Sequence, residues 1–585
     1  MSTPDLSDPV APDDTHESLP SDLAIASACS LDPITDVAVR AGLPAERLVS
    51  YGPYLAKVDH RVVEDLADRP LARYVAVTAI TPTPLGEGKT TTAVGLAQAM
   101  AVLGRHATLT IRQPSMGPTF GIKGGAAGGG WSQIVPMQSL NLHLTGDFHA
   151  VTAAHNLLAA MLDNHLHHGN ALGVDPRSIT WPRVLDVDDR ALRHVVVGLG
   201  SRTDGVPRQS RFDITAASEV MTLLGLARDL GDLRARLGRI VIGTTYDGQP
   251  VTAEDLHAAG AMAVILTDAL SPTLLQTLEH TPVLAHTGPF GNIATGNSSV
   301  LGDLVGVRTG EVLITEAGFG ADMGAERLFN VKSRVSGLAP EVAVVVATVR
   351  ALKVHSGAHR VVAGRPLPPE LLVENPDEVW QGAANLRHHL DIVARHGVTP
   401  VVAVNAFPTD HPSELAAVVQ IAAEHGVSAA VATHVRDGGK GATELAALVL
   451  DTLGSLDPAA PRFRMLYPES MPLVEKITTV AREVYGAAGV DLAPAAARDL
   501  DSYERLGYGH LPVVVAKTHL STTADPAAHG APRGWRLPVR EVRLAAGAGY
   551  VYALAGTIQT MPGLPAHPAA ERIDLRADGT IVGLG

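Results

Sequence analysis

Short runs of consecutive apolar residues alternate along the chain with longer segments in which apolar residues recur at helical spacing. Apolar runs without polar interruption are typical of strands buried on both faces of a parallel sheet. Such runs occur at 75–80, 107–112, 194–198, 240–242, 263–266, 342–346 and 401–404. Helical spacing is clearest at 90–103 and 156–162, and residues 25–66 are also mostly helical in pattern. The alternation predicts an α/β fold in which helices connect parallel strands.

The segment 75–92 is the first candidate for a ligand-binding site. It contains an apolar strand, a turn rich in Pro and Gly, and then Gly88, Lys89 and Thr90 at the start of a helical segment. Small residues at a helix start offer closely spaced backbone N–H groups to a triphosphate, while the lysine reaches the β- and γ-phosphates and the threonine hydroxyl holds Mg²⁺. The common phosphate-loop pattern has glycine where this chain has Thr83, so a plain turn with an exposed lysine is the alternative.

This loop between a strand and a helix predicts a phosphate-loop nucleoside-triphosphatase-like core with a mostly parallel sheet, plus smaller α+β domains. Residues 1–20 are rich in Asp, Pro, Ser and Thr and predict a disordered tail. We expect the core to span 21–455, with an inserted glycine-rich segment around 113–190. Shorter elements follow, which predicts a C-terminal α+β domain over 456–585.

Two basic residues lie close to the expected phosphate site. Arg112 ends the apolar run that follows the helix of the loop, and open α/β sheets bind ligands at the carboxyl ends of their strands. Its planar guanidinium suits phosphate or carboxylate, although a surface ion pair would explain a single arginine equally well. Lys57 precedes the first core strand and could face the phosphates or be a solvated lysine.

The segment 116–131 contains too many glycines for a stable helix or strand interior. Bulky residues such as Trp131 do not belong in a flexible linker, so we interpret the segment as a functional loop. His143, Asp147 and His149 follow and could bind zinc, but a fourth ligand at a familiar spacing is missing.

Composition narrows the classes of function. Hydrophobic residues make up 46% of the 585 residues and charged residues 18%, as in a soluble enzyme with a large core. No apolar stretch approaches about 20 residues and the first residues do not resemble a signal peptide, which predicts a cytoplasmic protein without membrane insertion. A net charge of -14 argues against nucleic-acid binding. Cys29 is the single cysteine, which excludes an intrachain disulfide and a cysteine-cluster metal site.

Seven motifs, in order along the chain, resemble those of the formate–tetrahydrofolate ligase family, also called 10-formyltetrahydrofolate synthetases. They are residues 81–91, 121–130, 144–149, 212–219, 315–322, 508–512 and 560–565. The resemblance extends from about residue 33 to residue 585, and it explains Thr83 because the family's phosphate loop has threonine there. A monofunctional ligase is expected, because no dehydrogenase or cyclohydrolase segment is appended.

The resemblance implies an ATP-dependent ligation of formate to tetrahydrofolate that gives 10-formyltetrahydrofolate, ADP and phosphate through formyl phosphate. The nucleotide site would comprise Thr83, Pro84, Leu85, Gly86, Glu87, Gly88, Lys89, Thr90 and Thr91. Arg112 and Lys123 would bind formate and formyl phosphate, and Asp147 would orient the folate amine or accept its proton. Lys89, Arg112 and Asp147 are thus the expected catalytic residues.

The same resemblance predicts a folate slot formed by Phe407, Pro408, Val435 and Phe319. Val435 occupies the position where the family pattern has a tryptophan opposite Phe407, which predicts weaker stacking on the pterin. The family also implies Mg²⁺ with ATP, an activating monovalent cation such as potassium or ammonium, and a homotetramer.

Two other interpretations fit the same residues. A phosphate-loop ATP-dependent ligase with a different acceptor would need the same loop, because a fold does not determine the substrate. A non-catalytic relative that binds folate or nucleotide would explain the missing aromatic residue at position 435. Release of ADP that requires both formate and tetrahydrofolate would separate the expected ligase from both.

Overall fold

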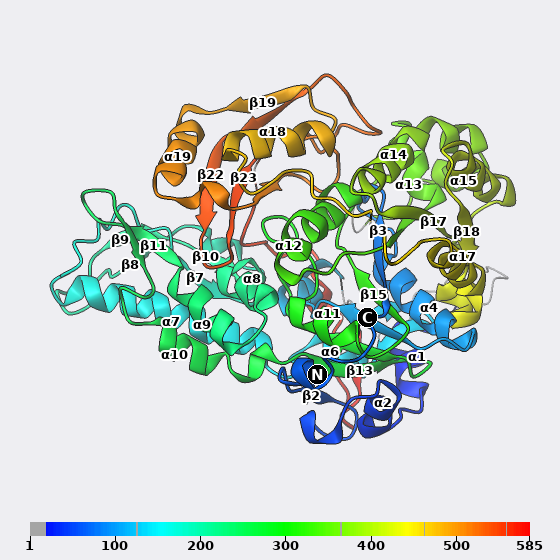
Figure 1. Cartoon of the computed structure of the whole chain (residues 1–585), viewed down its shortest axis with the longest axis horizontal. Coiled ribbons are helices and arrows are strands. Elements are labelled where there is room, and N and C mark those ends of the chain that lie inside the picture. The colour runs from blue at the N-terminus through cyan, green and yellow to red at the C-terminus, as the bar shows by residue number, and fades with distance from the viewer. Residues whose placement is uncertain (1–18, 124–126, 363–364, 461, 557, 585) are drawn as a thin grey trace, which may run out of the picture.

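The computed structural model describes residues 19–123, 127–362, 365–460, 462–556 and 558–584. A twelve-stranded sheet runs through the centre of this described part of the chain (Figure 1). Its order is β1 (Leu48–Ser50), β2 (Ala56–Val58), β13 (Thr273–Thr277), β14 (Pro282–Ala285), β4 (Ala107–Ile111), β15 (Val312–Glu316), β3 (Arg73–Ala79), β16 (Val342–Ala347), β17 (Thr399–Asn405) and β18 (Ala429–Ala432). In addition, β6 (Ser132–Val135) pairs with β13, and β5 (Gly128–Gly129) pairs with β6. Neighbouring strands from β14 to β18 are parallel. The mostly parallel α/β architecture expected from the sequence is confirmed.

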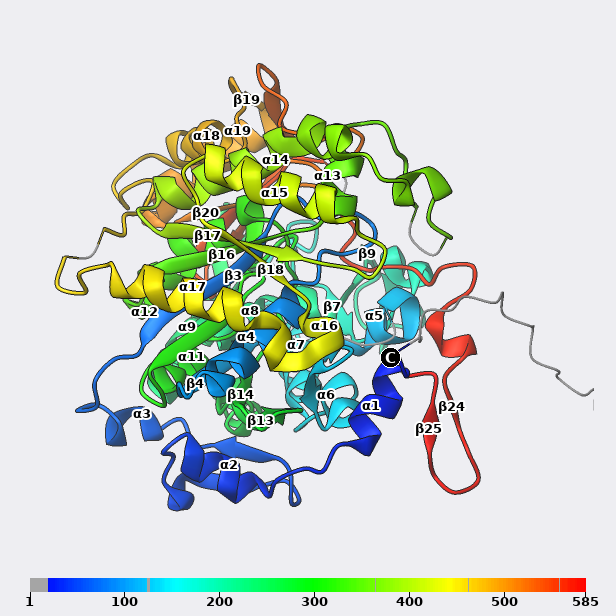
Figure 2. The same ribbon diagram turned by 90° about the vertical axis from the view of Figure 1, so that its right-hand side faces the viewer.

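Helices cover both faces of the parallel strands (Figure 2). On one face, alternate residues of β16 pack among α4 (Lys89–Val102) and α17 (Thr443–Gly454). On the other face, the remaining residues of β16 pack against α13 (Val349–His355), α14 (Pro376–Arg395) and α15 (Pro412–Glu424). Because both faces are buried, the central strands appear in the sequence as apolar runs without alternation.

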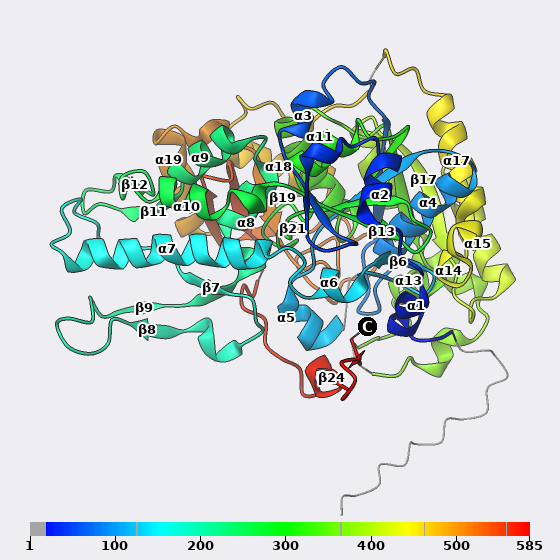
Figure 3. The same cartoon turned by 90° about the horizontal axis from the view of Figure 1, so that it is seen from below.

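A lobe built from residues 147–270 extends away from the sheet (Figure 3). Its helices are α7 (Asp147–His167), α8 (Glu219–Leu226), α9 (Leu230–Gly238) and α10 (Ala259–Ile265), and its ribbons are β7 (Arg183–Leu185) with β10 (Phe212–Ile214), β8 (Val195–Val197) with β9 (Arg208–Ser210), and β11 (Val241–Thr244) with β12 (Pro250–Thr252). One hydrophobic cluster joins these four helices.

Three apolar runs predicted as buried parallel strands lie in this lobe, and that prediction is wrong for each. The runs at 194–198 and 240–242 form β8 and β11, which belong to small antiparallel ribbons. Val196 is 58% exposed, so this apolar run does not mark a buried strand. The run at 263–266 lies mostly in α10, because a run this short fits a helix as well as a strand.

The N-terminal part was expected to be mostly helical, and only part of it is. Helices α1 (Asp22–Ala28), α2 (Ile34–Arg40) and α3 (Val62–Asp65) flank the antiparallel hairpin of β1 and β2. β2 pairs with β13, which lies more than 200 residues further along the chain. A partner that distant leaves no signal in the local periodicity, so the hairpin was missed.

The C-terminal part packs directly on the core helices. Its elements are α18 (Leu473–Glu483), β19 (Gly489–Leu492), α19 (Pro494–Arg505), β20 (Val513–Ala516), β21 (Arg536–Val539), β22 (Glu541–Ala545), β23 (Tyr550–Leu554), β24 (Asp574–Leu575) and β25 (Ile581–Val582). Its apolar side chains share one hydrophobic cluster with those of α14 and α15. A domain boundary near residue 456 therefore stays a prediction. Across the described residues, no helix combines the length and apolarity that crossing a membrane requires.

A half-buried glutamate joins the lobe to the turn between β22 and β23. Glu219, the first residue of α8, accepts hydrogen bonds from the backbone N–H groups of Gly547 (2.7 Å) and Ala548 (3.1 Å). Arg236 donates to the carbonyl of Ala548 at 3.0 Å. Burial raises the pKa of the Glu219 carboxyl to about 7, although the two N–H donors oppose the rise.

The Glu219→Gln variant is expected to be more heat-stable than the wild type at pH 8. The folded-state pKa of about 7 exceeds the ordinary value of 4.5, so the stabilising contribution of Glu219 is complete below pH 4.5 and is lost as the pH rises through 7. Glutamine keeps the acceptor oxygen but does not ionise. Between pH 5 and pH 8, the melting temperature of Glu219→Gln should rise relative to that of the wild type, by a few degrees at pH 8. The control Glu444→Gln, which changes an exposed glutamate, should show no such pH-dependent difference. A difference that is constant with pH would contradict this assignment.

Candidate active site

The carboxyl ends of the parallel strands bring the candidate residues to one edge of the sheet. β3 leads into the phosphate loop, and β4 leads into Arg112. Glu316 is the last residue of β15, Thr348 follows β16, and Asn405 ends β17. Ligands of open α/β sheets bind at this edge, so the strand order assembles residues that lie far apart in the sequence.

The phosphate loop is held in shape by the side chain of Glu87. Its carboxylate accepts hydrogen bonds from the backbone N–H of Thr83 (2.7 Å) and from the hydroxyl of Thr348 (2.8 Å). Gly86 and Gly88 have φ angles of 76° and 72°, which a residue with a side chain rarely adopts. Thr83, at the position where the common phosphate-loop pattern has glycine, is buried, and its hydroxyl accepts from a backbone N–H within the loop.

Helix α4 begins directly at the loop. Gly88 caps it, and a Cβ atom at this position would lie 2.3 Å from Nδ2 of Asn405, so the close approach requires glycine. Lys89 and Thr90 are the first two residues of the helix. Free N–H groups at a helix start favour an anion, so this end of α4 suits the phosphates of a nucleotide.

Thr90 lies beside an acidic residue that the sequence interpretation did not assign. Its hydroxyl donates to Oε2 of Glu316 at 3.0 Å, and Glu316 is only 7% exposed. A hydroxyl and a carboxylate oxygen are the hard ligands that Mg²⁺ prefers, so the pair suits a metal ion bound with a nucleotide. Glu316 lies in one of the family-like motifs, and its position at the end of an apolar run was the signal that could have identified it.

Arg112 lies next to this pair. Its guanidinium approaches Oε1 of Glu316 to 4.0 Å and donates to the carbonyl of Pro289 at 3.4 Å. A Cβ atom on Gly318 would lie 2.8 Å from Nη2, so the guanidinium packs closely on that glycine. Nε is buried and has no hydrogen-bond partner among the described residues. Arg112 thus belongs to the same site as Thr90 and retains a donor for an anion.

Asp147 forms a buried ion pair with Lys57 at the same edge. The two atoms Nζ and Oδ1 lie 2.6 Å apart, and Lys57 is 3% exposed. The lysine also donates to the carbonyl of Ser271 at 2.7 Å. Lys57 is therefore not a solvated lysine, because its charge is directed into the protein. The sequence contained no sign of this pairing, since 90 residues separate the partners.

Phe407 lies beyond β17, and its ring is partly covered by a residue that was not predicted. The guanidinium carbon of Arg350 lies 3.5 Å from the ring centroid, a cation–π contact. Asp410 accepts the backbone N–H of Phe407 at 2.9 Å. Pro408 is exposed beside it. Arg350 is therefore a basic neighbour of the folate slot that was predicted at Phe407 and Pro408.

Val435 lies beyond β18 and packs on the glycine-rich loop. A Cβ atom on Gly130 would lie 2.8 Å from Cγ1 of Val435, and the backbone N–H of Trp131 donates to the carbonyl of Val435 at 2.8 Å. Trp131 is 44% exposed. The backbone contact therefore brings an aromatic residue of the loop next to Val435 in the structure.

Phe319 lies three residues beyond the end of β15. It has a φ angle of 63°, which is rare for a residue with a bulky side chain and typical of functional segments. Its ring stacks on His519 at a centroid distance of 4.7 Å. A Cβ atom on Gly291 would lie 2.3 Å from this ring, so the glycine makes room for it.

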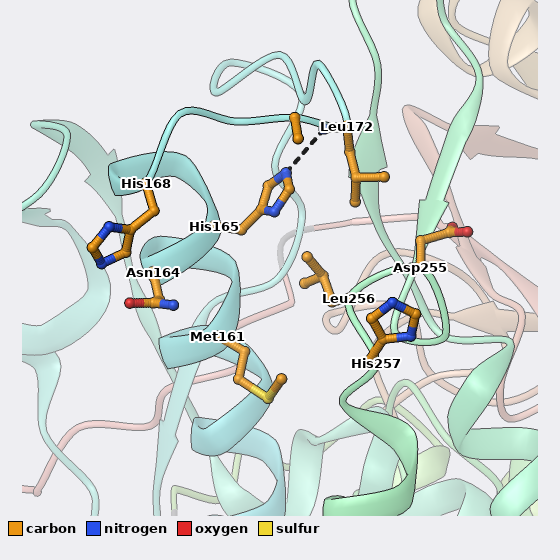
Figure 4. Close-up of a pocket in the computed structure, with 9 residues that line it drawn as sticks. Met161, Asn164, His165, His168, Leu172, Asp255, Leu256 and His257 are labelled. Carbon is orange, nitrogen blue, oxygen red and sulfur yellow. Dashed lines mark hydrogen bonds between the residues drawn. The ribbon is translucent and has the colours of Figure 1, made fainter.

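Two further candidates from the sequence are Lys123 and the zinc set of His143, Asp147 and His149. The side chain of Lys123 falls outside the described residues, as do residues 124–126. Among the described residues, no group of three or more His, Cys, Asp or Glu side chains could hold a metal ion. Figure 4 shows a pocket near His165 and His257, where His165 accepts the backbone N–H of Leu172. It lies at the far end of α7 from Asp147, about 30 Å away by helix length, and is separate from the candidate site.

A strand, a glycine-containing loop and a helix start that face a Thr–Glu oxygen pair are typical of α/β proteins with a phosphate-binding loop. The model of the formate–tetrahydrofolate ligase family matches residues 20–585. The chain is 62% identical to a formate–tetrahydrofolate ligase of Saccharopolyspora erythraea over 97% of its own length and all of the relative's length. It is equally similar to one of Cutibacterium acnes, over 96% of this chain and all of that one. The protein belongs to the formate–tetrahydrofolate ligase family.

Proposed function

We propose that this protein ligates formate to tetrahydrofolate at the expense of ATP and gives 10-formyltetrahydrofolate, ADP and phosphate. Three features that lie at one edge of the sheet support this function. These are the phosphate loop, Arg112 beside the Thr90 and Glu316 oxygens, and the buried pair of Lys57 and Asp147. The match to the ligase family over residues 20–585 supports the choice of substrates.

In the first step, a formate oxygen attacks the γ-phosphorus of ATP, the bond to ADP breaks, and formyl phosphate forms. Two anions must approach each other, so the site has to neutralise charge and hold the groups in line. Lys89 and the start of α4 bind the phosphates, and Arg112 orients formate. Thr90 and Glu316 would hold the Mg²⁺ that accompanies ATP, which supplies further charge neutralisation when it is bound.

In the second step, the folate amine attacks the formyl carbon, the carbon–oxygen bond breaks, and phosphate leaves. The amine loses a proton as the carbon–nitrogen bond forms, and Asp147 is the carboxylate that accepts it. We further infer, from the family resemblance, activation by potassium or ammonium, a homotetramer and a cytoplasmic location. Lys123, Phe407, Pro408 and Phe319 keep their proposed roles in binding formyl phosphate and folate.

Oxygen labelling tests the intermediate. The oxygen of formate that attacks phosphorus stays on phosphate when the carbon–oxygen bond breaks. Formate labelled with ¹⁸O is therefore expected to deliver one labelled oxygen to the phosphate released in each turnover. Unlabelled phosphate, formed together with 10-formyltetrahydrofolate, would contradict formyl phosphate as the intermediate.

The Trp131→Ala variant is expected to raise the KM for tetrahydrofolate several-fold and to leave the KM values for ATP and formate unchanged. Val435 lacks an aromatic face, and Trp131 is the aromatic residue bonded to it. An aromatic contact is worth roughly 0.5 to 1.5 kcal/mol beyond its buried area, which corresponds to this change. Steady-state kinetics measure it, and Trp131→Phe is the matched control that should keep most of the affinity.

The companion variant Val435→Trp should lower the KM for tetrahydrofolate, because the introduced tryptophan supplies an aromatic face at the folate slot. The same decrease is expected when Val435→Trp is added to Trp131→Ala. Folate KM values that are the same in all of these folded variants would show that the slot lies elsewhere.

A further inference from the structure

The side chains of Lys57 and Asp147 form an ion pair, and both are buried. Lys57 lies in β2, and Asp147 is the first residue of α7. The lysine is held by two acceptors at short range, Oδ1 of Asp147 at 2.6 Å and the carbonyl of Ser271 at 2.7 Å. The side chains of both partners are 3% exposed. Burying two charges is costly, and the short contacts of this pair offset part of that cost.

The two oxygens of Asp147 have different surroundings. Oδ1 accepts from Lys57 and, at 3.4 Å, from the hydroxyl of Thr145. Oδ2 is buried and has no hydrogen-bond partner among the described residues. A buried carboxylate oxygen without a donor costs free energy, so Oδ2 retains an unused capacity to accept a hydrogen bond. The pair thus fixes the carboxylate through one oxygen and leaves the other for chemistry.

We propose that Lys57 is a positioning residue of the formyl-transfer step, which keeps Asp147 ionised and directs its Oδ2 to the folate amine. This inference rests on the proposed function. As the carbon–nitrogen bond forms and phosphate leaves, the proton of the amine passes to Oδ2 of Asp147 and later to water. Lys57 keeps its own proton throughout and touches no substrate.

The charges around the pair explain why a lysine is needed. Burial raises the pKa of the Asp147 carboxyl, and the Lys57 ammonium opposes this rise. Asp268 raises that pKa further, because it adds a second negative charge on the neighbouring segment. Tyr51 faces the same carboxylates, and burial raises the pKa of its phenol, so it stays neutral. His286, near Lys57, is also neutral, because burial lowers its pKa to about 3. Lys57 is therefore the positive charge that offsets two carboxylates.

The test compares the two half-reactions in the Lys57→Met variant of the full-length protein. Exchange between ATP and ADP that depends on formate reports the first step, and single-turnover formation of 10-formyltetrahydrofolate reports the second. At pH 7 the loss in transfer should exceed the loss in exchange at least tenfold. The rising limb of the pH profile for transfer should move to higher pH, because Asp147 without its counter-ion takes up a proton. Equal losses in both steps, or an unmoved pH profile, would overturn the proposal.

Two further variants separate positioning from folding. Asp147→Asn should slow transfer more than exchange, and adding Lys57→Met to it should cost no further transfer rate, because the lysine acts through the aspartate. A multiplicative loss in the double variant would contradict this. Lys57→Arg keeps the charge and should leave the pH profile where it is in the wild type, so a shifted profile in Lys57→Arg overturns the proposal even if Lys57→Met does not fold. Wild-type protein without any formate-dependent exchange would instead disprove the proposed function.

Discussion

Lys89→Ala is expected to lower formate-dependent turnover by about three orders of magnitude while the protein stays folded. Removing one preorganised charge or donor that stabilises a transferring phosphoryl group costs roughly 10²- to 10³-fold or more, because the interaction strengthens in the transition state. Lys89 is the first residue of α4, at the helix start that faces the phosphate site. The measurement is kcat for ADP release at saturating formate and tetrahydrofolate, with circular dichroism and Tm as checks on folding.

The matched control is Lys440→Ala, which removes an exposed lysine beyond β18. It should leave kcat within about twofold of the wild-type value, as surface substitutions usually do. A folded Lys89→Ala protein with near-normal kcat would refute the assignment of the phosphate loop.

The second large effect is expected for Arg112→Leu, which should reduce formation of formyl phosphate by about 10²-fold and weaken ATP binding far less. Arg112 lies beside Glu316 rather than on the loop, and its buried Nε has no partner among the described residues. Leucine removes every donor from a site that must hold formate against a triphosphate. Formate-dependent exchange between ATP and ADP and direct titration with ATP measure the two effects separately.

Arg112→Lys tests whether the shape of the guanidinium matters. Lysine keeps the charge but lacks the planar fork that binds a carboxylate with two hydrogen bonds, so it should recover only a small part of the lost rate. If Arg112→Leu lowers ATP affinity and exchange by equal factors, Arg112 is an anchor for the nucleotide and formate is bound elsewhere.

The parts of the site that could be predicted from the sequence are those encoded locally. β3, the loop and α4 follow one another without interruption, so an apolar run, Gly88 and a helical segment were sufficient to place Lys89 and Thr90. Arg112 could be found because it directly follows the apolar run of β4. β16 and β17 are buried on both faces of the sheet, so each is an uninterrupted apolar run that could be recognised in the sequence.

The parts that were missed depend on partners distant in the chain. The hairpin of β1 and β2 exists because β2 pairs with β13. Glu316 meets Thr90 only because β15 and β3 are neighbours in the sheet. Arg350 covers Phe407, and Lys57 pairs with Asp147, through contacts that no periodicity or spacing records. Folding brings these side chains together, and a single sequence carries no local sign of it.

The proposed ligase activity can be tested by measuring ADP release by the purified protein in the presence and absence of each substrate. Rapid release is expected only when ATP, formate and tetrahydrofolate are all present, with one 10-formyltetrahydrofolate formed for each ADP. ADP release that is indifferent to formate and tetrahydrofolate would indicate an ATPase or ligase with another acceptor. Binding of folate or nucleotide without any release of ADP would indicate a non-catalytic relative, and either result would contradict the proposed ligase activity.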